Sequence, residues 1–209
     1  MIFNPGNYCL AENPEIIKKF RDGGTNLLFV GRIAPNKKIE DLLEIFYFYK
    51  TYVNPASRLI LVGGIFKLFE PYYGRLCRLV EELGLEGVFF ARGVSQRDLV
   101  SFYRVADVYL SASEHEGFGV PLLEAMYFGL PVVAYRAAAV PETLGGAGIM
   151  YQEKNPALVA ELIERVVGEV NWRAALVARQ YLRVQDFYPE RITAILRPWL
   201  KKINPPIII

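Results

Sequence analysis

Two acidic side chains flank a glycine turn in residues 115–124, which have the sequence HEGFGVPLLE. Pro121 has the fixed φ that suits a first helical position, so we expect a helix to begin there and to continue to Phe128. Glu116 then lies in the loop before the helix, and Glu124 lies one turn inside it. Helical side chains lean toward the N-terminus, so the Glu124 carboxylate is expected to reach a ligand docked over that end.

The backbone of the same turn can attract an anion. The N–H groups of Gly119 and Val120 are expected to face the ligand, because the first N–H groups of a helix lack helical partners and carry partial positive charge. A carboxylate beside them can accept hydrogen bonds from sugar or ribose hydroxyls. This combination suits a nucleotide sugar. The alternative is that Glu124 is an ordinary surface acid in a first turn, where acids are common.

Apolar runs on both sides place this turn in a sheet. The run VYLS at 108–111 precedes the turn, and the run PVVA at 131–134 follows the expected helix. The segment is therefore predicted to form a strand, a helix and a second strand. Ligands of open α/β sheets bind at the carboxyl ends of strands, which is where residues 111–119 must lie.

A pair of cations follows an earlier strand in the same way. The apolar run 27–30 ends in Gly31-Arg32, and Lys37 precedes a second apolar-periodic helix. An arginine fork binds phosphate oxygens bidentately and a lysine adds a mobile charge, so the two can neutralise a diphosphate. The alternative is that both are solvated loop cations. We interpret Lys38 as an exposed charge at the start of the helix.

Taken together, three motifs resemble a known family. Gly31-Arg32 with Lys37, residues 116–124 and Val140-Pro141-Glu142 are similar to the C-terminal domain of family 4 retaining glycosyltransferases of the GT-B fold. The resemblance extends from about residue 4 to residue 200, and its motifs are specific in their combination of order, spacing and strand context. The resemblance implies one half of a GT-B fold, the half that binds a nucleoside-diphosphate sugar such as a UDP-sugar or GDP-sugar.

The resemblance also implies a role for individual residues. Arg32 and Lys37 would hold the donor diphosphate, Glu124 the ribose hydroxyls and Glu116 the transferred sugar, with Arg32, Lys37 and Glu116 as the catalytic set. Phe118 and Gly119 would shape the sugar pocket, and the backbone of residues 90–94 would contact the base. The implied donor-binding residues are Arg32, Lys37, Gly93, Val94, Glu116, Gly117, Phe118, Gly119, Val120 and Glu124.

Two parts of the sequence depart from the family pattern, one residue and one loop. Lys38 stands where the family usually has glycine, and Ala137-Ala138-Ala139 replaces a glycine-rich loop before Pro141. The base and the sugar of the donor stay open. No metal or other cofactor is expected, because the cations and helix N–H groups neutralise the diphosphate and no acidic motif of the Asp-x-Asp kind is present. His115 is the only histidine, which also argues against a multi-histidine metal site.

Composition fits a globular enzyme domain of 209 residues with 53% hydrophobic content and a net charge of +2. The near-neutral charge gives no electrostatic case for nucleic acid, and no apolar stretch approaches the length of a membrane span. No secretory signal is apparent, so we expect a protein in the cytoplasm or peripheral at the inner face of a membrane. Cys9 and Cys77 are interpreted as reduced thiols, with a disulfide as the alternative.

Strand and helix patterns alternate along the chain, which predicts an α/β fold: a Rossmann-like, doubly wound parallel sheet with C-terminal helices. The expected strands are 27–30, 59–62, 88–90, 108–111, 131–134 and 149–151. The expected helices are 39–49, 72–83, 97–105, 121–128, 157–167, 172–181 and 189–200. Gly63-Gly64 is interpreted as a tight strand exit, and Asp107 as a cap or turn residue.

The predicted organisation is a linker at 1–26, a nucleotide-sugar-binding domain at 27–187, a crossover helix at 188–204 and an apolar tail at 205–209. Asn4-Pro5-Gly6 resembles the family's interdomain linker, which implies that an N-terminal acceptor-binding domain is missing from this chain. The last helix carries an apolar stripe, which either packs on the domain's own sheet or favours contact with another domain or copy. The stripe comprises Ile192, Ile195, Leu196, Trp199 and Leu200.

Two classes of function remain open. The first is the donor-binding half of a retaining glycosyltransferase that passes sugar to a glycan or lipid acceptor and is inactive without its acceptor domain. The second is a non-catalytic nucleotide-sugar-binding or regulatory subunit. A nucleotide-sugar epimerase of the same fold is a further enzyme alternative. NAD binding is not expected, because only Gly31 follows the first strand where a dinucleotide fingerprint needs three glycines.

Overall fold

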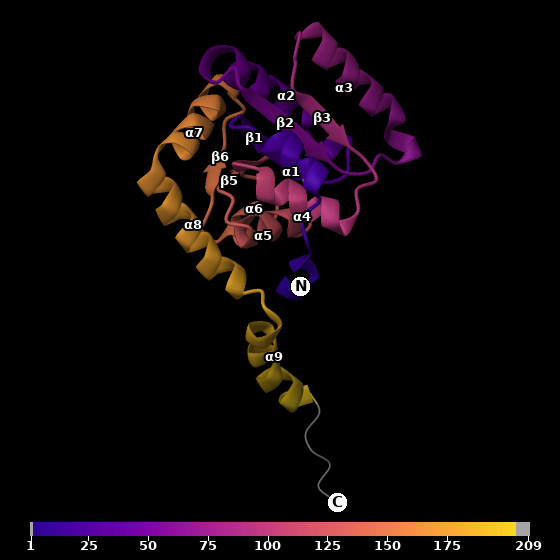
Figure 1. The fold of residues 1–209 in the computed structure, drawn as a ribbon. Coiled ribbons are helices and arrows are strands. Elements are labelled where there is room, and N and C mark those ends of the chain that lie inside the picture. The colour runs from indigo at the N-terminus through magenta and orange to yellow at the C-terminus, as the bar shows by residue number, and fades with distance from the viewer. Residues whose placement is uncertain (1, 204–209) are drawn as a thin grey trace, which may run out of the picture.

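The computed structural model describes residues 2–203, and in them six parallel strands form one sheet (Figure 1). The strand order is β3-β2-β1-β4-β5-β6, so the order reverses between β1 and β4. This is the doubly wound order of nucleotide-binding α/β domains, and it confirms the predicted fold class. The strands are β1 (Thr25–Val30), β2 (Ser57–Val62), β3 (Val88–Ala91), β4 (Val108–Ser111), β5 (Val132–Tyr135) and β6 (Ile149–Tyr151).

Helices connect the strands and cover both faces of the sheet. They are α1 (Pro14–Phe20), α2 (Ile39–Phe48), α3 (Glu70–Glu82), α4 (Gln96–Val105), α5 (Val120–Tyr127), α6 (Val140–Leu144), α7 (Pro156–Gly168), α8 (Val170–Gln185) and α9 (Pro189–Ile203). The predicted helices are all present within a few residues of their expected bounds, whereas α1 and α6 were not predicted. Helix α3 ends at Glu82, two residues before Gly84, whose φ of +59° suits the end of a helix.

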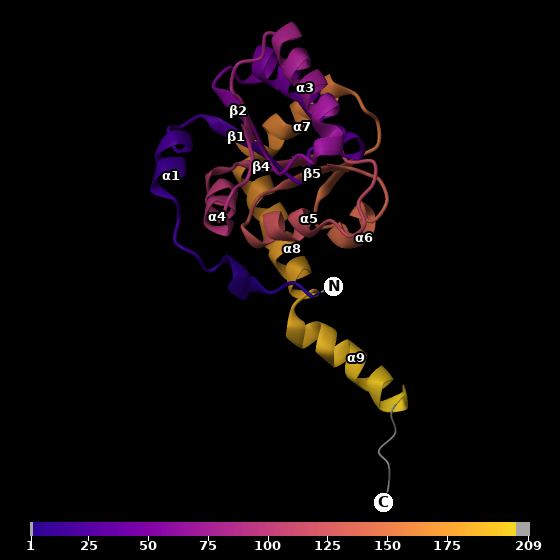
Figure 2. The ribbon, with the colours of Figure 1, turned by 90° about the vertical axis from the view of Figure 1, so that its right-hand side faces the viewer.

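Alternating side chains of the central strands build two apolar layers. Leu27 and Phe29 of β1 belong to the layer beneath α2, α3 and α7, while Leu28 belongs to the layer beneath α1, α4, α5 and α6. All three side chains are essentially inaccessible to water. Figure 2 shows the two groups of helices on opposite sides of the sheet. Burial on both faces explains why the strands are continuous apolar runs.

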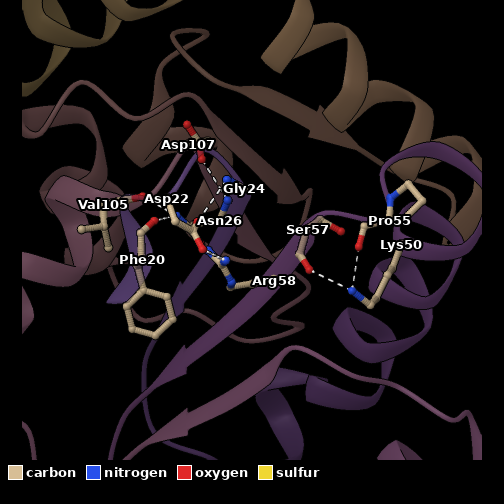
Figure 3. Close-up of polar contacts among 10 residues, drawn as sticks. All are labelled: Phe20, Asp22, Gly24, Asn26, Lys50, Pro55, Ser57, Arg58, Val105 and Asp107. Atoms are coloured by element: carbon tan, nitrogen blue, oxygen red, sulfur yellow. Dashed lines mark hydrogen bonds and ion pairs between the residues drawn. The ribbon is translucent and has the colours of Figure 1, made fainter. Parts of the chain in front are cut away.

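The amino-terminal edge of the sheet is closed by its own hydrogen bonds (Figure 3). Buried Asn26 donates through Nδ2 to the carbonyl oxygens of Phe20 and Val105, at 2.7 and 2.9 Å. Its Oδ1 accepts a hydrogen bond from Arg58, and its backbone N–H donates to Asp107 Oδ2 at 2.8 Å. Asp107 is thus the structural residue that was expected, and burial raises the pKa of its carboxyl group.

Helix α9 extends away from the body of the domain in both views (Figures 1 and 2). On its apolar stripe, Ile195, Leu196 and Trp199 are 54%, 48% and 64% exposed. The alternative that this stripe packs on the domain's own sheet is therefore wrong for these residues. The side chain of Leu200 and the apolar tail at 205–209 lie outside the described residues. None of the described helices has the length and apolar character that a membrane span requires.

The structure agrees with the expectation that both cysteines are reduced. Cys9 is exposed, Cys77 is partly buried, and both are free thiols. Cys9 lies in the N-terminal segment and Cys77 in α3, on different layers of the domain. The disulfide alternative is therefore wrong.

Candidate functional site

Charged loops gather where the strand order reverses, at the carboxyl ends of β1 and β4. The two strands are hydrogen-bonded neighbours, with Leu27 opposite Val108 and Leu28 opposite Tyr109. The chain leaves β1 at Gly31 and leaves β4 at Ala112, so the two loops that carry the predicted site residues emerge side by side. Ligands of doubly wound sheets bind in the crevice at such a switch point.

An ion pair joins these two loops. Lys37 donates through Nζ to Glu116 Oε1 at 2.6 Å, and their side chains are only 12% and 14% exposed. Lys37 lies in the short turn η2 (Pro35–Lys37), and Glu116 lies in the loop before α5 as predicted. The alternative that Lys37 is a solvated loop cation is wrong, because its ammonium group is largely shielded and paired. Two predicted site residues from distant parts of the sequence thus meet.

Backbone and side-chain contacts support this pair. The N–H of Glu114 donates to the carbonyl oxygen of Asn36 at 3.0 Å, and Asn36 Nδ2 donates to the carbonyl oxygen of His115 at 3.3 Å. Lys154, beyond β6, pairs with Glu114 and with Asp41 of α2. The loops after β1, β4 and β6 are therefore fixed to one another. His115 itself is exposed, as expected for a loop residue.

The two departures from the family pattern have a common backbone property. Lys38 has a φ of 49° and Ala138 a φ of 47°, and they are the positive-φ residues other than glycine within residues 2–203. The left-handed region costs a residue with a Cβ about 1 to 2 kcal/mol. A glycine at either place would avoid this strain. Lys38 is half-buried and pairs with Glu40 and Glu114, so the expectation of an exposed charge was wrong.

Arg32 adds a further cation to the site, next to the ion pair of Lys37 and Glu116. Its side chain is exposed directly after β1, and its guanidinium lies over the ring of Phe66, 5.6 Å from the centroid. Within the described residues no carboxylate pairs with it. Phe66 was not singled out from the sequence. An aromatic support of this kind leaves the N–H fork of the arginine available to phosphate oxygens.

Gly63 brings the loop after β2 against the loop after β1. A Cβ atom on Gly63 would lie 1.8 Å from the carbonyl oxygen of Gly31, so no side chain fits. The Gly31 N–H donates to the Val62 carbonyl at 2.9 Å, and the Ile33 N–H donates to Gly64 at 3.0 Å. The predicted tight strand exit is thus confirmed, and the close approach fixes the path of the chain on both sides of Arg32.

The turn before α5 has the expected glycine geometry. Gly119 has a φ of +79° and caps the helix, which begins at Val120 and ends at Tyr127. The helix was predicted one residue later at both ends. Pro121 occupies the first turn, where its missing N–H is harmless. The Gly119 and Val120 N–H groups donate to no acceptor within residues 2–203; Gly119 is buried and Val120 is partly buried.

The third sequence motif supports the turn from behind. Val140-Pro141-Glu142 opens α6, and the Thr143 hydroxyl of that helix donates to the carbonyl oxygen of Phe118. The Phe118 ring packs edge-on against Phe187, with centroids 5.5 Å apart. The segment 116–118 is thereby held between α6 and the end of α8. Gly117, at the centre of this segment, is exposed.

Glu124 lies deeper than a surface acid. The residue is 7% exposed, and its carboxylate oxygens accept hydrogen bonds from the hydroxyls of Tyr8 and Tyr103, both at 2.6 Å. The surface-acid alternative is therefore wrong. A tyrosine hydroxyl is protonated at neutral pH, and burial raises the pKa of Tyr8 and of Tyr103 still further, so both hydroxyls act as donors. Sequence reasoning missed both tyrosines, because neither lies near Glu124 in the chain.

The sequence matches the family described as glycosyl transferases group 1 over residues 12–182. The chain belongs to the glycosyl transferases group 1 family. O-antigen chain mannosyltransferase B of Escherichia coli is 30% identical over 79% of this chain and 43% of that protein. A D-inositol 3-phosphate glycosyltransferase of Frankia alni is 30% identical over 99% of this chain and 52% of its own length. The chain thus spans about half the length of these curated relatives.

Solved structures agree on the fold. The C-terminal domain of LpcC, a group 1 glycosyl transferase of Francisella tularensis, has a TM-score of 0.73 and 24% identity over 88% of this chain and 96% of that one. Anabaena Alr3699/HepE, crystallised in complex with UDP, has a TM-score of 0.82 and 22% identity over 96% of this chain and 56% of that one. This group 1 chain therefore has the fold of a C-terminal, Rossmann-like GT-B domain.

The remaining predicted site residues of this group 1 chain lie at the same edge of the sheet. Gly93, with a φ of +62°, and Val94 follow β3 and precede α4. Gly93 is exposed and Val94 is partly buried. Their assignment to the base stays a prediction. Within the described residues no group of three or more His, Cys, Asp or Glu side chains is arranged to hold a metal ion.

Proposed function

We propose that this chain is the donor-binding half of a retaining glycosyltransferase of family 4, which transfers sugar from a nucleoside-diphosphate sugar to a glycan or lipid acceptor. The contact between Lys37 and Glu116 at the strand switch point carries the proposal. It joins a cation suited to a diphosphate and an acid suited to sugar hydroxyls, in the crevice where such folds bind ligands. The two relatives named above, a mannosyltransferase and a D-inositol 3-phosphate glycosyltransferase, support the same reaction class.

The proposed roles follow from charge and position. Exposed Arg32, with Lys37 and the N–H groups of Gly119 and Val120, stabilises the diphosphate as the anomeric C–O bond breaks and the electron pair moves to the leaving oxygen. The acceptor oxygen then bonds to the anomeric carbon on the same face, and its proton passes to the diphosphate. Glu116 binds hydroxyls of the sugar that bears the developing positive charge. Glu124 binds the ribose.

The positive groups of the site neutralise the diphosphate, so we propose that donor binding needs no metal ion.

The acceptor must be held against the anomeric carbon, and positioning of this kind can supply about 7 to 11 kcal/mol of barrier lowering. We propose that a preceding domain, in the half of the relatives that this chain does not span, provides it. The isolated chain then binds donor without transferring sugar.

Calorimetric titration tests the proposal directly. The purified chain is titrated in EDTA with UDP, GDP, their glucose and mannose conjugates, and NAD. We expect binding to a nucleoside diphosphate and its sugar conjugate, no binding to NAD, and no sugar transfer to lipid or oligosaccharide acceptors. Affinity for NAD alone would overturn the site assignment, and affinity that EDTA abolishes would overturn the metal-free site. Rapid transfer by the isolated chain would disprove the need for a second domain.

A further inference from the structure

The carboxylate of Glu124 is held from two directions. Tyr8 donates to Oε1 from the turn η1 (Pro5–Tyr8), whereas Tyr103 donates to Oε2 from α4. Both hydroxyl-to-carboxylate distances are 2.6 Å, short enough for strong charge-assisted hydrogen bonds. Two such bonds to opposite oxygens fix the rotamer of Glu124 and the plane of its carboxylate.

This arrangement leaves acceptor capacity unused. An ionised carboxylate has about four acceptor positions, two on each oxygen, and the tyrosines occupy one on each. The two positions left over equal in number the two hydroxyl donors of a ribose. Because the rotamer is already fixed, a ligand that binds there does not have to order the side chain, and that saving favours binding.

The N-terminal segment that supplies Tyr8 is an ordered part of the domain. The Tyr8 ring stacks on Phe3 with centroids 5.3 Å apart and an angle of 10°, and it also contacts the rings of Tyr127 and Phe128. The N–H of Phe3 donates to the carbonyl oxygen of Phe187 at 2.7 Å. Tyr8 lies before residues 12–182, over which the family was matched, so the family match does not account for it.

We propose that Tyr8 and Tyr103 are positioning residues that hold the Glu124 carboxylate in place to accept hydrogen bonds from the ribose hydroxyls of a nucleoside diphosphate. This inference rests on the proposed function and extends the site to the N-terminal segment. Neither tyrosine touches the ligand. Each acts through Glu124, and the loss of either hydroxyl weakens recognition of the ribose and leaves the diphosphate contacts of Arg32 and Lys37 intact.

The test removes hydroxyl groups from the ligand as well as from the protein. Tyr8→Phe, Tyr103→Phe and the wild-type chain are titrated calorimetrically with UDP and GDP and with the 2′,3′-dideoxy form of each. Tyr49→Phe is the matched control. Tyr49 is also buried and donates to a carboxylate, that of Glu164, at 2.9 Å, but it lies in the layer on the other face of the sheet.

We expect both site variants to bind the preferred ribonucleotide about threefold to tenfold more weakly, as the loss of one hydrogen bond predicts. Affinity for the dideoxy form should not change, and Tyr49→Phe should change neither affinity. A Glu124→Ala background should abolish the effect of Tyr8→Phe, because the shared partner is gone. Thermal melts identify any variant that fails to fold. If Tyr103→Phe fails to fold, the comparison of Tyr8→Phe with the double variant Tyr8→Phe/Glu124→Ala still tests the proposal.

The outcomes separate two kinds of failure. Equal weakening of the ribonucleotide and its dideoxy form would mean that the tyrosines only support the fold, and unchanged ribonucleotide affinity would mean that they do nothing for binding. Either result overturns this inference and leaves the proposed function standing. A wild-type chain that binds none of the nucleotides overturns the proposed function, and the inference falls with it.

Discussion

Lys37 and Glu116 are in direct contact although 79 residues separate them in the sequence. Each is the partner of the other in the structure, whereas the two are expected to bind different parts of a donor, the diphosphate and the sugar. A donor must therefore either bind to both side chains while they stay in contact or separate them. We therefore expect a substitution at Glu116 to change the affinity for a nucleotide sugar and the affinity for a bare nucleotide by different amounts.

Glu116→Ala should weaken a nucleotide sugar about tenfold or more, through lost hydrogen bonds to the sugar. Affinity for the bare nucleoside diphosphate should be unchanged or higher, because Lys37 is released from its carboxylate. Calorimetry with the two ligands measures both effects. An equal loss of affinity for the bare nucleotide and the nucleotide sugar would refute the sugar role of Glu116.

Arg32→Ala should remove a charge-assisted phosphate contact of about 1.5 to 3 kcal/mol, or roughly tenfold to a hundredfold in affinity for a nucleoside diphosphate. The corresponding nucleoside should bind as before. Arg165→Ala is a suitable control, since Arg165 is an exposed cation of α7 paired with Glu169. Equal effects on nucleotide and nucleoside would show that Arg32 does not bind phosphate.

Gly63→Ala should destabilise the domain by about 3 kcal/mol, because the new Cβ atom collides with the Gly31 carbonyl and forces the backbone apart. Gly64→Ala is the matched control, since nothing lies within 4 Å of a Cβ atom there. Urea denaturation of the two variants measures the difference. Similar stabilities would mean that the loops after β1 and β2 separate at little cost.

Ala138→Gly should stabilise the domain by about 0.5 to 1 kcal/mol, because relief of the left-handed strain exceeds the added entropy of an unfolded glycine. The neighbouring Ala139 has a φ of −79° and suffers no such strain, so Ala139→Gly should destabilise by a similar amount. Melting temperatures should therefore move in opposite directions, by roughly 2 to 4 °C per kcal/mol. A loss of stability in both variants would contradict the expectation.

Alkaline conditions should unfold the domain through its buried tyrosines. Burial raises the pKa of Tyr8, Tyr49, Tyr103 and Tyr109 above the ordinary value of 10.0. The folded state then binds more protons than the unfolded state above about pH 10, so stability is complete below that pH and falls as the pH rises. Denaturation series between about pH 8 and 11 measure the decline. Stability that stayed constant over this range would contradict the burial of these hydroxyls.

Strands and long helices were predictable because apolar runs and helical periodicity are local properties of the chain. Helix α1 was missed although it has a signal, since Asn13 caps it and Pro14 occupies its first turn. Helix α6 has five residues, too few for a periodic pattern, and was noticed only as the motif at Val140. Short helices depend on packing rather than on periodicity, and packing is not visible in a local sequence window.

The candidate site was predictable where its residues follow strand ends, and was not predictable where they come from other parts of the chain. The sequence placed Lys37 and Glu116 at strand ends, and the parallel sheet brings strand ends together. Nothing local connects Glu124 with Tyr8, which is 116 residues away and comes from outside the sheet. The strain at Lys38 follows from the backbone path, although the absence of an expected glycine was the signal that could have revealed it.

The hydrogen bond from the Phe3 N–H to the Phe187 carbonyl joins two segments that are far apart in the sequence. It ties the segment that precedes η1 to the turn between α8 and α9. Tyr8, at the end of η1, contacts Glu124, and Phe187, in that turn, contacts Phe118. The two segments that this hydrogen bond joins therefore support the candidate site at Glu124 and at Phe118, so the position of one side of the site depends on the position of the other.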